Sequence, residues 1–218
     1  MDRRDTPAAL LMGRSLARST VSGRLPGVTF AGAKENLHGD WESANRARPL
    51  LMIDIDGVLS LFGMPAPGAP FGASRPSAPE GRFHSIDGIP HFLSATAAAH
   101  LLALAPLFDL VWASGWEEKA EEYLPHLLGL PAGLPFLRFG TDARQRRTAN
   151  AHWKLDAIDA HAASRPLAWI DDSFNGACED WAAARRAPTL LVQTAPERGL
   201  TSREERLLAE WATALAAS

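Results

Sequence analysis

The sequence PLLMIDIDGV at residues 49–58 decides how the rest of the chain is interpreted. Its apolar part, residues 50–53, is a short continuous hydrophobic run, which is typical of a parallel strand buried on both faces. Two carboxylates, Asp54 and Asp56, follow this run, and Gly57 permits a turn that brings backbone N–H groups near a bound anion. Taken alone, such an acid pair is equally well explained as a surface turn or a helix cap.

Strands and helices are expected to alternate after this run. Further strands are predicted at residues 109–113, 136–139, 167–170 and 189–192, and helices at 91–105, 116–128, 150–162, 178–186 and 202–217. Five strands interleaved with helices predict an α/β fold, a Rossmann-like three-layer sandwich around a five-stranded parallel sheet. Right-handed crossovers then place the carboxyl ends of all strands along one edge, where ligands of open α/β folds bind.

The composition predicts two parts of different character. Residues 1–47 are rich in Arg, Ser, Gly and Ala without sustained periodicity, so we expect a flexible or weakly structured N-terminal leader. Residues 48–218 are expected to form one catalytic domain. Within it, residues 60–90 are dense in Pro and Gly, which predicts a long flap that could contain a hairpin.

The overall composition is that of a globular protein, with 46% hydrophobic and 22% charged residues among 218. The formal net charge of −3 provides no global field that would attract nucleic acid or an anionic membrane surface. No apolar run approaches the roughly 20 residues of a membrane-spanning helix, and the single cysteine fits a reducing compartment. A cytoplasmic protein without a membrane partner is therefore expected.

Polar residues also end two later apolar runs. Ser114 and Gly115 follow the strand expected at 109–113, and their hydroxyl and N–H groups suit a phosphate oxygen. Taken alone, Ser114 is better explained as the cap of the next helix. Asp171 and Asp172 end the next-to-last strand and could supply oxygens to a hard cation, a pair that is harder to explain structurally.

Lys154 is the candidate cation of the site and lies in the helix expected at 150–162. Its ammonium could neutralise a phosphate and hold Asp54 ionised. A lone lysine on a helix is ordinarily solvated, and taken alone that explanation is favoured by roughly four to one.

Taken in chain order, these four places resemble the four signature motifs of the haloacid dehalogenase (HAD) superfamily. The resemblance covers residues 49–193, and the conjunction of motifs is far more specific than any one of them. Within the superfamily, the chain is similar to a small bacterial subgroup with SGWE at residues 114–117, WIDD at 169–172 and a late GLT at 199–201. Members of this subgroup are mostly described only as HAD-like proteins, and some are related to domains of predicted RNA-repair proteins, so the resemblance does not identify a substrate.

The resemblance implies a magnesium-dependent phosphohydrolase acting on an unidentified phosphate ester. Asp54 would be the nucleophile that forms an aspartyl-phosphate, and Asp56 would protonate the leaving oxygen and later activate water. Mg²⁺ would be held by Asp54, the backbone carbonyl of Asp56 and Asp171, with Asp172 as ligand or support. Because the dehalogenase branch lacks the second acid, Asp56 favours phosphoryl transfer over carbon–halogen cleavage.

The resemblance also assigns the remaining substrate contacts. Ser114 and Lys154 would bind the phosphoryl oxygens, with Gly115 contributing its backbone N–H group, and Trp116, beside Ser114, is expected at the rim of the substrate site. Asn175 stands where some related phosphatases carry a further acid.

The flap is the only candidate for a cap, so a minimal cap and an open site are expected. Openness is common among relatives that act on macromolecular substrates, and Arg144, Arg146 and Arg147 could contact a polyanion, although a solvated basic turn is the simpler explanation. His84 and His91 lie in or beside the flap and could contact substrate, but surface histidines are the simpler interpretation.

Two alternatives to a phosphohydrolase of small esters stay open. One is a nucleic-acid end-processing phosphatase, which shares the chemistry and differs in substrate. The other is a catalytically silent binding module with the same fold, against which the intact acids and lysine argue. The sequence leaves the oligomeric state open.

Overall fold

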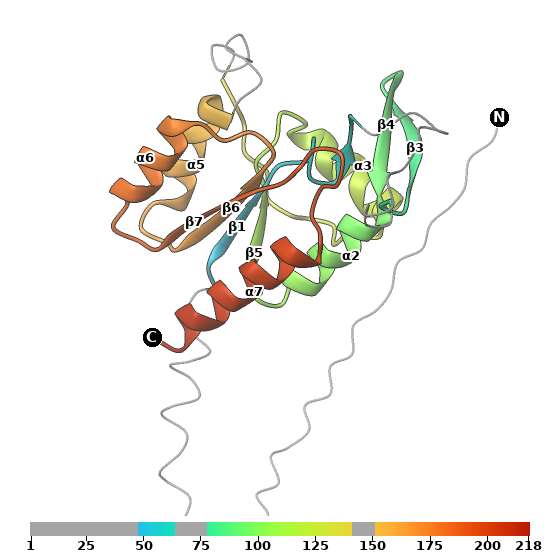
Figure 1. Ribbon diagram of the computed structural model, residues 1–218. Coiled ribbons are helices and arrows are strands. Elements are labelled where there is room, and N and C mark those ends of the chain that lie inside the picture. The colour runs from blue at the N-terminus through green and yellow to red at the C-terminus, as the bar shows by residue number, and fades with distance from the viewer. Residues whose placement is uncertain (1–47, 64–77, 141–150) are drawn as a thin grey trace, which may run out of the picture. The chain divides into compact units, whose positions relative to one another are not determined.

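The computed structural model describes residues 48–63, 78–140 and 151–218 (Figure 1). The predicted leader at residues 1–47 lies outside this part, as do Arg144, Arg146 and Arg147. No helix in these three ranges is long and apolar enough to cross a membrane.

A parallel sheet forms the centre of the fold, in the order β5-β1-β6-β7. Its strands are β5 (Asp109–Trp112), β1 (Leu50–Ile53), β6 (Leu167–Asp171) and β7 (Thr189–Gln193). β1 pairs with β5 on one side and with β6 on the other, and every residue of β1 is buried. This central position explains why β1 is a continuous apolar run rather than an alternating one, and the predicted parallel α/β sheet is confirmed.

The prediction of a fifth sheet strand at residues 136–139 is wrong. In the described ranges this segment makes a single parallel bridge, from Phe136 to Trp112, beside the four-stranded sheet. Leu137 N–H donates to the carbonyl of Trp112, and Trp112 N–H donates to that of Pro135. Proline has no N–H group, so Pro135 cannot donate to β5 and the ladder does not continue on the N-terminal side of Phe136.

Helices cover both faces of the sheet, as the three-layer prediction requires. Leu51 and Ile53 of β1 belong to one core cluster, with side chains of α2 (Ala95–Leu104), α3 (Glu118–Leu128) and α7 (Ser202–Ala216). The alternating residues Leu50 and Met52 belong to a second cluster on the opposite face, with side chains of α5 (Leu155–Ala162) and α6 (Gly176–Ala184). Figure 1 shows α5 and α6 on one side of the strands and α2 with α7 on the other.

The flap contains more regular structure than its composition suggests. β2 (Ser60–Leu61), β3 (Gly81–Ile86) and β4 (Ile89–Ser94) form an antiparallel sheet in the order β2-β4-β3. The sheet extends past residue 90, and the flap below means these three strands. The hairpin turns at Asp87 and Gly88, which both have positive φ. Lys119 and Tyr123 of α3 donate to the carboxylate of Asp87, so the hairpin tip is attached to the main domain.

The helix predicted at residues 91–105 begins later than expected. Residues 91–94 belong to β4, and α2 starts at Ala95 because the Ser94 hydroxyl accepts a hydrogen bond from Ala97 N–H at 3.1 Å. The side chain of Ser94 therefore ends the strand and caps the helix.

Gly199 gives a test of how tightly the segment after β7 packs against the loop after β1. Its φ is +66°, and an added Cβ would lie 2.3 Å from the backbone carbonyl oxygen of Val58. Gly129 has a similar φ of +67° with nothing within 4 Å of an added Cβ. Gly199→Ala should therefore lower the free energy of unfolding by about 3 kcal/mol, and Gly129→Ala by only about 1 kcal/mol, in urea denaturation. Equal losses would contradict the close approach.

Candidate active site

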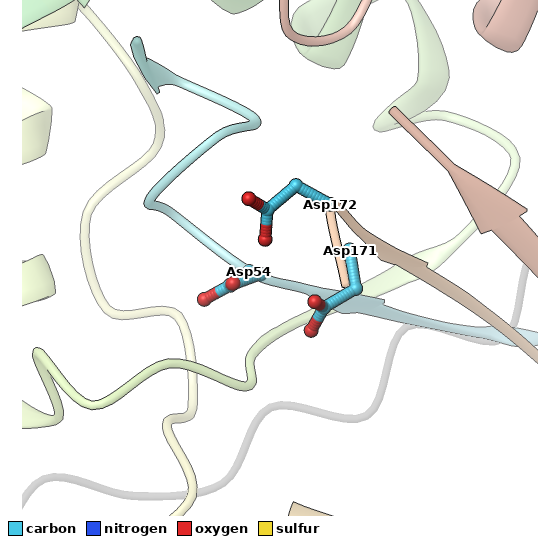
Figure 2. A group of neighbouring side chains, drawn as sticks. All are labelled: Asp54, Asp171 and Asp172. Carbon is cyan, nitrogen blue, oxygen red and sulfur yellow. The ribbon is translucent and has the colours of Figure 1, made fainter. Parts of the chain in front are cut away.

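The carboxyl ends of β1 and β6 bring three acids together. Asp54 follows β1 directly, Asp171 is the last residue of β6, and Asp172 comes next. Each offers an oxygen within 4.8 Å of the others (Figure 2). Because β1 and β6 are paired neighbours in the sheet, the strand-end argument correctly places these acids in one cluster.

Lys154 lies inside this cluster. Its Nζ is 2.8 Å from Oδ2 of Asp54 and 2.6 Å from Oδ2 of Asp171, and its side chain is 4% exposed. It is the last residue of a 3-10 turn, η1 (Ala151–Lys154), that precedes α5. A lysine this deeply buried requires ionic partners, so the explanation of Lys154 as a solvated helix residue is wrong.

The electrostatics of the cluster show an excess of negative charge. Burial, followed by repulsion from Asp54, raises the pKa of Asp171 to about 7 and that of Asp172 to about 6. Burial by itself lowers the pKa of Lys154, but the nearby carboxylates of Asp54 and Asp171 outweigh it and raise the pKa. One ammonium therefore does not balance the acids around it.

This donor set fits a magnesium ion. Mg²⁺ is a hard cation that prefers carboxylate oxygens, and Asp54, Asp171 and Asp172 offer three converging carboxylates with unbalanced charge. Gly57 permits this convergence, because its φ is +73° and a Cβ there would lie 2.5 Å from the side chain of Asp172. A larger residue at position 57 would displace Asp172 from the cluster.

Asp56 lies beside this cluster with a half-exposed side chain. Trp116 Nε1 donates a hydrogen bond to its Oδ2 at 3.1 Å, and His91 Nδ1 lies 3.9 Å from its Oδ1. Partial burial of the carboxyl, followed by the nearby charge of Asp54, raises the pKa of Asp56 above its usual range. Such a carboxyl retains its proton to higher pH than a free aspartate, as a general acid requires.

Ser114 is buried next to the loop after β1. It follows β5, and the preceding residue, Ala113, donates its N–H to the carbonyl of Ile53 at 2.7 Å. Its side chain does not cap α3, whose N-terminal cap position is Glu117. Ser114 is 1% exposed, and its hydroxyl has no hydrogen-bond partner among the described residues, so its capacity to bond an oxygen is unused there.

Residues 50–204 match the family model of the HAD domain in Swiss Army Knife RNA repair proteins. The chain belongs to this family. The match covers all the site residues described above and confirms the predicted HAD superfamily membership in its RNA-repair-related subgroup. No curated protein and no solved structure matches the chain significantly.

Two residues that support the site of this HAD domain were missed by the sequence analysis. Thr194 Oγ1 donates to the carbonyl of Gly57 at 2.8 Å, and Gln193 Nε2 donates to that of Asp172 at 3.1 Å. Both lie at the carboxyl end of β7, next to β6. Applying the strand-end criterion to β7 would have found them.

Asn175 and Glu117 have structural contacts in this HAD domain. The Asn175 side chain accepts a hydrogen bond from Cys178 N–H at 3.2 Å and caps α6. Asn175, which occupies the position where some related phosphatases have a further acid, therefore begins a helix. Glu117 is buried with a φ of +49°, and its Oε1 accepts from Phe139 N–H at 2.9 Å. Glu117 therefore joins the turn after β5 to the segment around Phe139.

The raised pKa values predict how a magnesium ion held by these acids would change the stability of the fold at different pH. Asp171 and Asp172 bind protons in the folded chain at a pH where the unfolded chain has released them. Without a cation, their contribution to stability is therefore greatest at low pH and falls as the pH rises from about 4 to about 7. Mg²⁺ binds the ionised carboxylates, so the increase in Tm on adding it should be larger at about pH 8 than at about pH 5.

Thermal unfolding with Mg²⁺, against sodium chloride of equal ionic strength, checks this expectation. Asp172→Asn should reduce the magnesium effect, whereas Asp180→Asn, which changes an exposed aspartate on α6, should preserve it. A magnesium effect that is independent of pH, or identical in both variants, would exclude these acids as ligands.

Proposed function

We propose that this chain is a magnesium-dependent phosphohydrolase that acts through an aspartyl-phosphate on Asp54. The observation that carries the proposal is the buried contact of Asp54 with the Lys154 ammonium, beside the converging acids Asp171 and Asp172. A carboxylate is a nucleophile toward a phosphate dianion only where positive charge offsets their repulsion. Lys154 provides part of that charge.

The cation completes the charge balance in this proposal. Mg²⁺, held by Asp54, the backbone carbonyl of Asp56, Asp171 and Asp172, would supply Lewis-acid stabilisation of negative charge on the phosphoryl oxygens. The Ser114 hydroxyl and the N–H groups of Gly115 and Trp116 would bind and orient the same oxygens.

The first chemical step transfers the phosphoryl group to the enzyme. An oxygen of Asp54 forms a bond to phosphorus while the bond from phosphorus to the ester oxygen breaks, and Asp56 gives its proton to that leaving oxygen. In the second step, water forms the new bond to phosphorus and the bond to Asp54 breaks. Asp56 takes the proton of the attacking water, which returns both acids to their starting states.

A phosphorylated nucleic-acid end is the second candidate substrate. The family description, a domain of RNA repair proteins, favours it, since end repair requires removal of misplaced phosphates. The net charge of −3 gives it no support. A catalytically silent binding module is the weaker alternative, because such a module has no need to bury Lys154 between two acids.

The first experiment measures phosphate release from small phosphate esters and from 5′- and 3′-phosphorylated oligonucleotides. Wild-type chain with Mg²⁺ should release phosphate, and chelation of the metal should stop the release. Asp54→Asn removes the nucleophile at nearly constant volume and should lower the rate by at least about 1,000-fold.

Asp180→Asn serves as the matched control and should keep the wild-type rate. Faster release from oligonucleotides than from small esters would favour the end-processing candidate. Release that persists in Asp54→Asn, or wild-type release no faster than that variant on every substrate, would contradict the proposed function.

A further inference from the structure

The two oxygens of the Asp56 carboxyl have different surroundings. Oδ2 accepts the indole N–H of Trp116 at 3.1 Å, whereas Oδ1 lies 3.9 Å from His91 Nδ1, beyond hydrogen-bond distance. An indole nitrogen only donates, so Trp116 fixes Oδ2 as an acceptor and leaves Oδ1 as the oxygen that can exchange a proton with substrate.

Trp116 is in turn held by the flap. The imidazole of His91, on β4, packs edge-to-face against the ring of Trp116, with ring centroids 4.8 Å apart and an interplanar angle of 68°. Ser60 Oγ, on β2, shares a hydrogen bond of 3.0 Å with His91 Nδ1. One flap side chain, His91, therefore packs against the indole, and a second, Ser60, holds that imidazole in place.

β2, the flap strand that contains Ser60, is also connected to the loop that carries Asp56. Gly57 N–H donates to the carbonyl of Ser60 at 2.8 Å, and Ser60 N–H donates to that of Ile55 at 2.9 Å. The chain from Ile55 to Ser60 thus forms a closed turn. Asp56 lies near its start, and Ser60, which is hydrogen-bonded to His91, lies at its end.

We propose that His91 and Trp116 are positioning residues that hold Asp56 with Oδ1 directed to the leaving oxygen of the ester. The inference rests on the proposed phosphohydrolase function and adds a role for the flap. His91 acts through Trp116, and Trp116 acts through its hydrogen bond to Asp56. The flap thereby determines how well the enzyme cleaves esters whose leaving group needs a proton.

If His91 and Trp116 position Asp56, their substitution should slow the cleavage of esters with poor leaving groups more than that of esters with good ones. A general loss of structure would slow both alike. Phenyl phosphate and 4-nitrophenyl phosphate have nearly the same shape, but nitrophenolate leaves readily without a proton and phenolate leaves poorly. Trp116→Phe keeps an aromatic ring and removes the donor, so Oδ2 becomes free and the carboxyl can rotate. It should slow phenyl phosphate cleavage roughly tenfold or more and 4-nitrophenyl phosphate cleavage less than about threefold.

The experiment follows release of the phenol with enzyme in excess, in a single turnover with Mg²⁺. This readout reports only the first chemical step, so slower hydrolysis of the aspartyl-phosphate does not contribute. His91→Ala should show the same selectivity with a smaller loss, and Asp56→Asn gives the largest selective loss that the site can show.

Two matched controls separate positioning from packing. His84→Ala removes the residue directly across from His91 in the hairpin, and Trp181→Phe removes another indole donor, which is bonded to Asp159 on the far side of the sheet. Both should leave the ratio of the two rates unchanged.

The outcomes distinguish this inference from the function on which it rests. Equal slowing of both esters by Trp116→Phe, or no slowing of either, overturns the positioning role while the phosphohydrolase stands. A wild-type chain that cleaves neither ester faster than Asp54→Asn overturns the proposed function and this inference with it.

Discussion

The ammonium of Lys154, buried between Asp54 and Asp171, is the interaction on which the rest of the site depends. Removing three charged groups from water is costly, and the cost is offset only if all three meet with good geometry. The acids come from neighbouring parallel strands, and the lysine comes from η1, which lies between these two strands in the sequence. The order of the sheet and the position of η1 together bring these three charges into contact, and a divalent cation would offset the negative charge that remains.

Close backbone approaches keep the loops around this centre in place. The loop after β1 is contacted by Thr194 at Gly57 and by the segment after β7 at Gly199, where a side chain would collide with Val58. The flap is attached to the same loop through Ser60. The strand ends, the flap and the segment after β7 are thus connected to one another, and these connections hold the acids of the site in fixed positions.

The sequence predicted the parts of this structure that depend on local pattern. β1 is apolar throughout, and β6 is apolar up to its last residue, Asp171, because each strand is buried on both faces. The acids at their ends are correctly placed because parallel strands end at one edge of a sheet. The segment at 136–139 failed as a strand because it makes one bridge to β5, and Phe139 N–H then donates to the side chain of Glu117 rather than to a strand carbonyl, a contact across 22 residues of chain that an apolar pattern does not show. The burial of Lys154 and the contact of His91 with Trp116 depend on tertiary packing across 17 and 25 residues of chain, so neither could be derived from spacing alone.

The central claim, that Asp54 receives the phosphoryl group, is tested most directly by trapping the intermediate. Borohydride reduces an acyl phosphate to an alcohol, so brief treatment of the enzyme during turnover would convert a phosphorylated aspartate to homoserine. Peptide mass spectrometry should then find that conversion at Asp54, only with substrate and Mg²⁺ present. Conversion at another acid, or rapid turnover with no conversion at Asp54, would contradict the account.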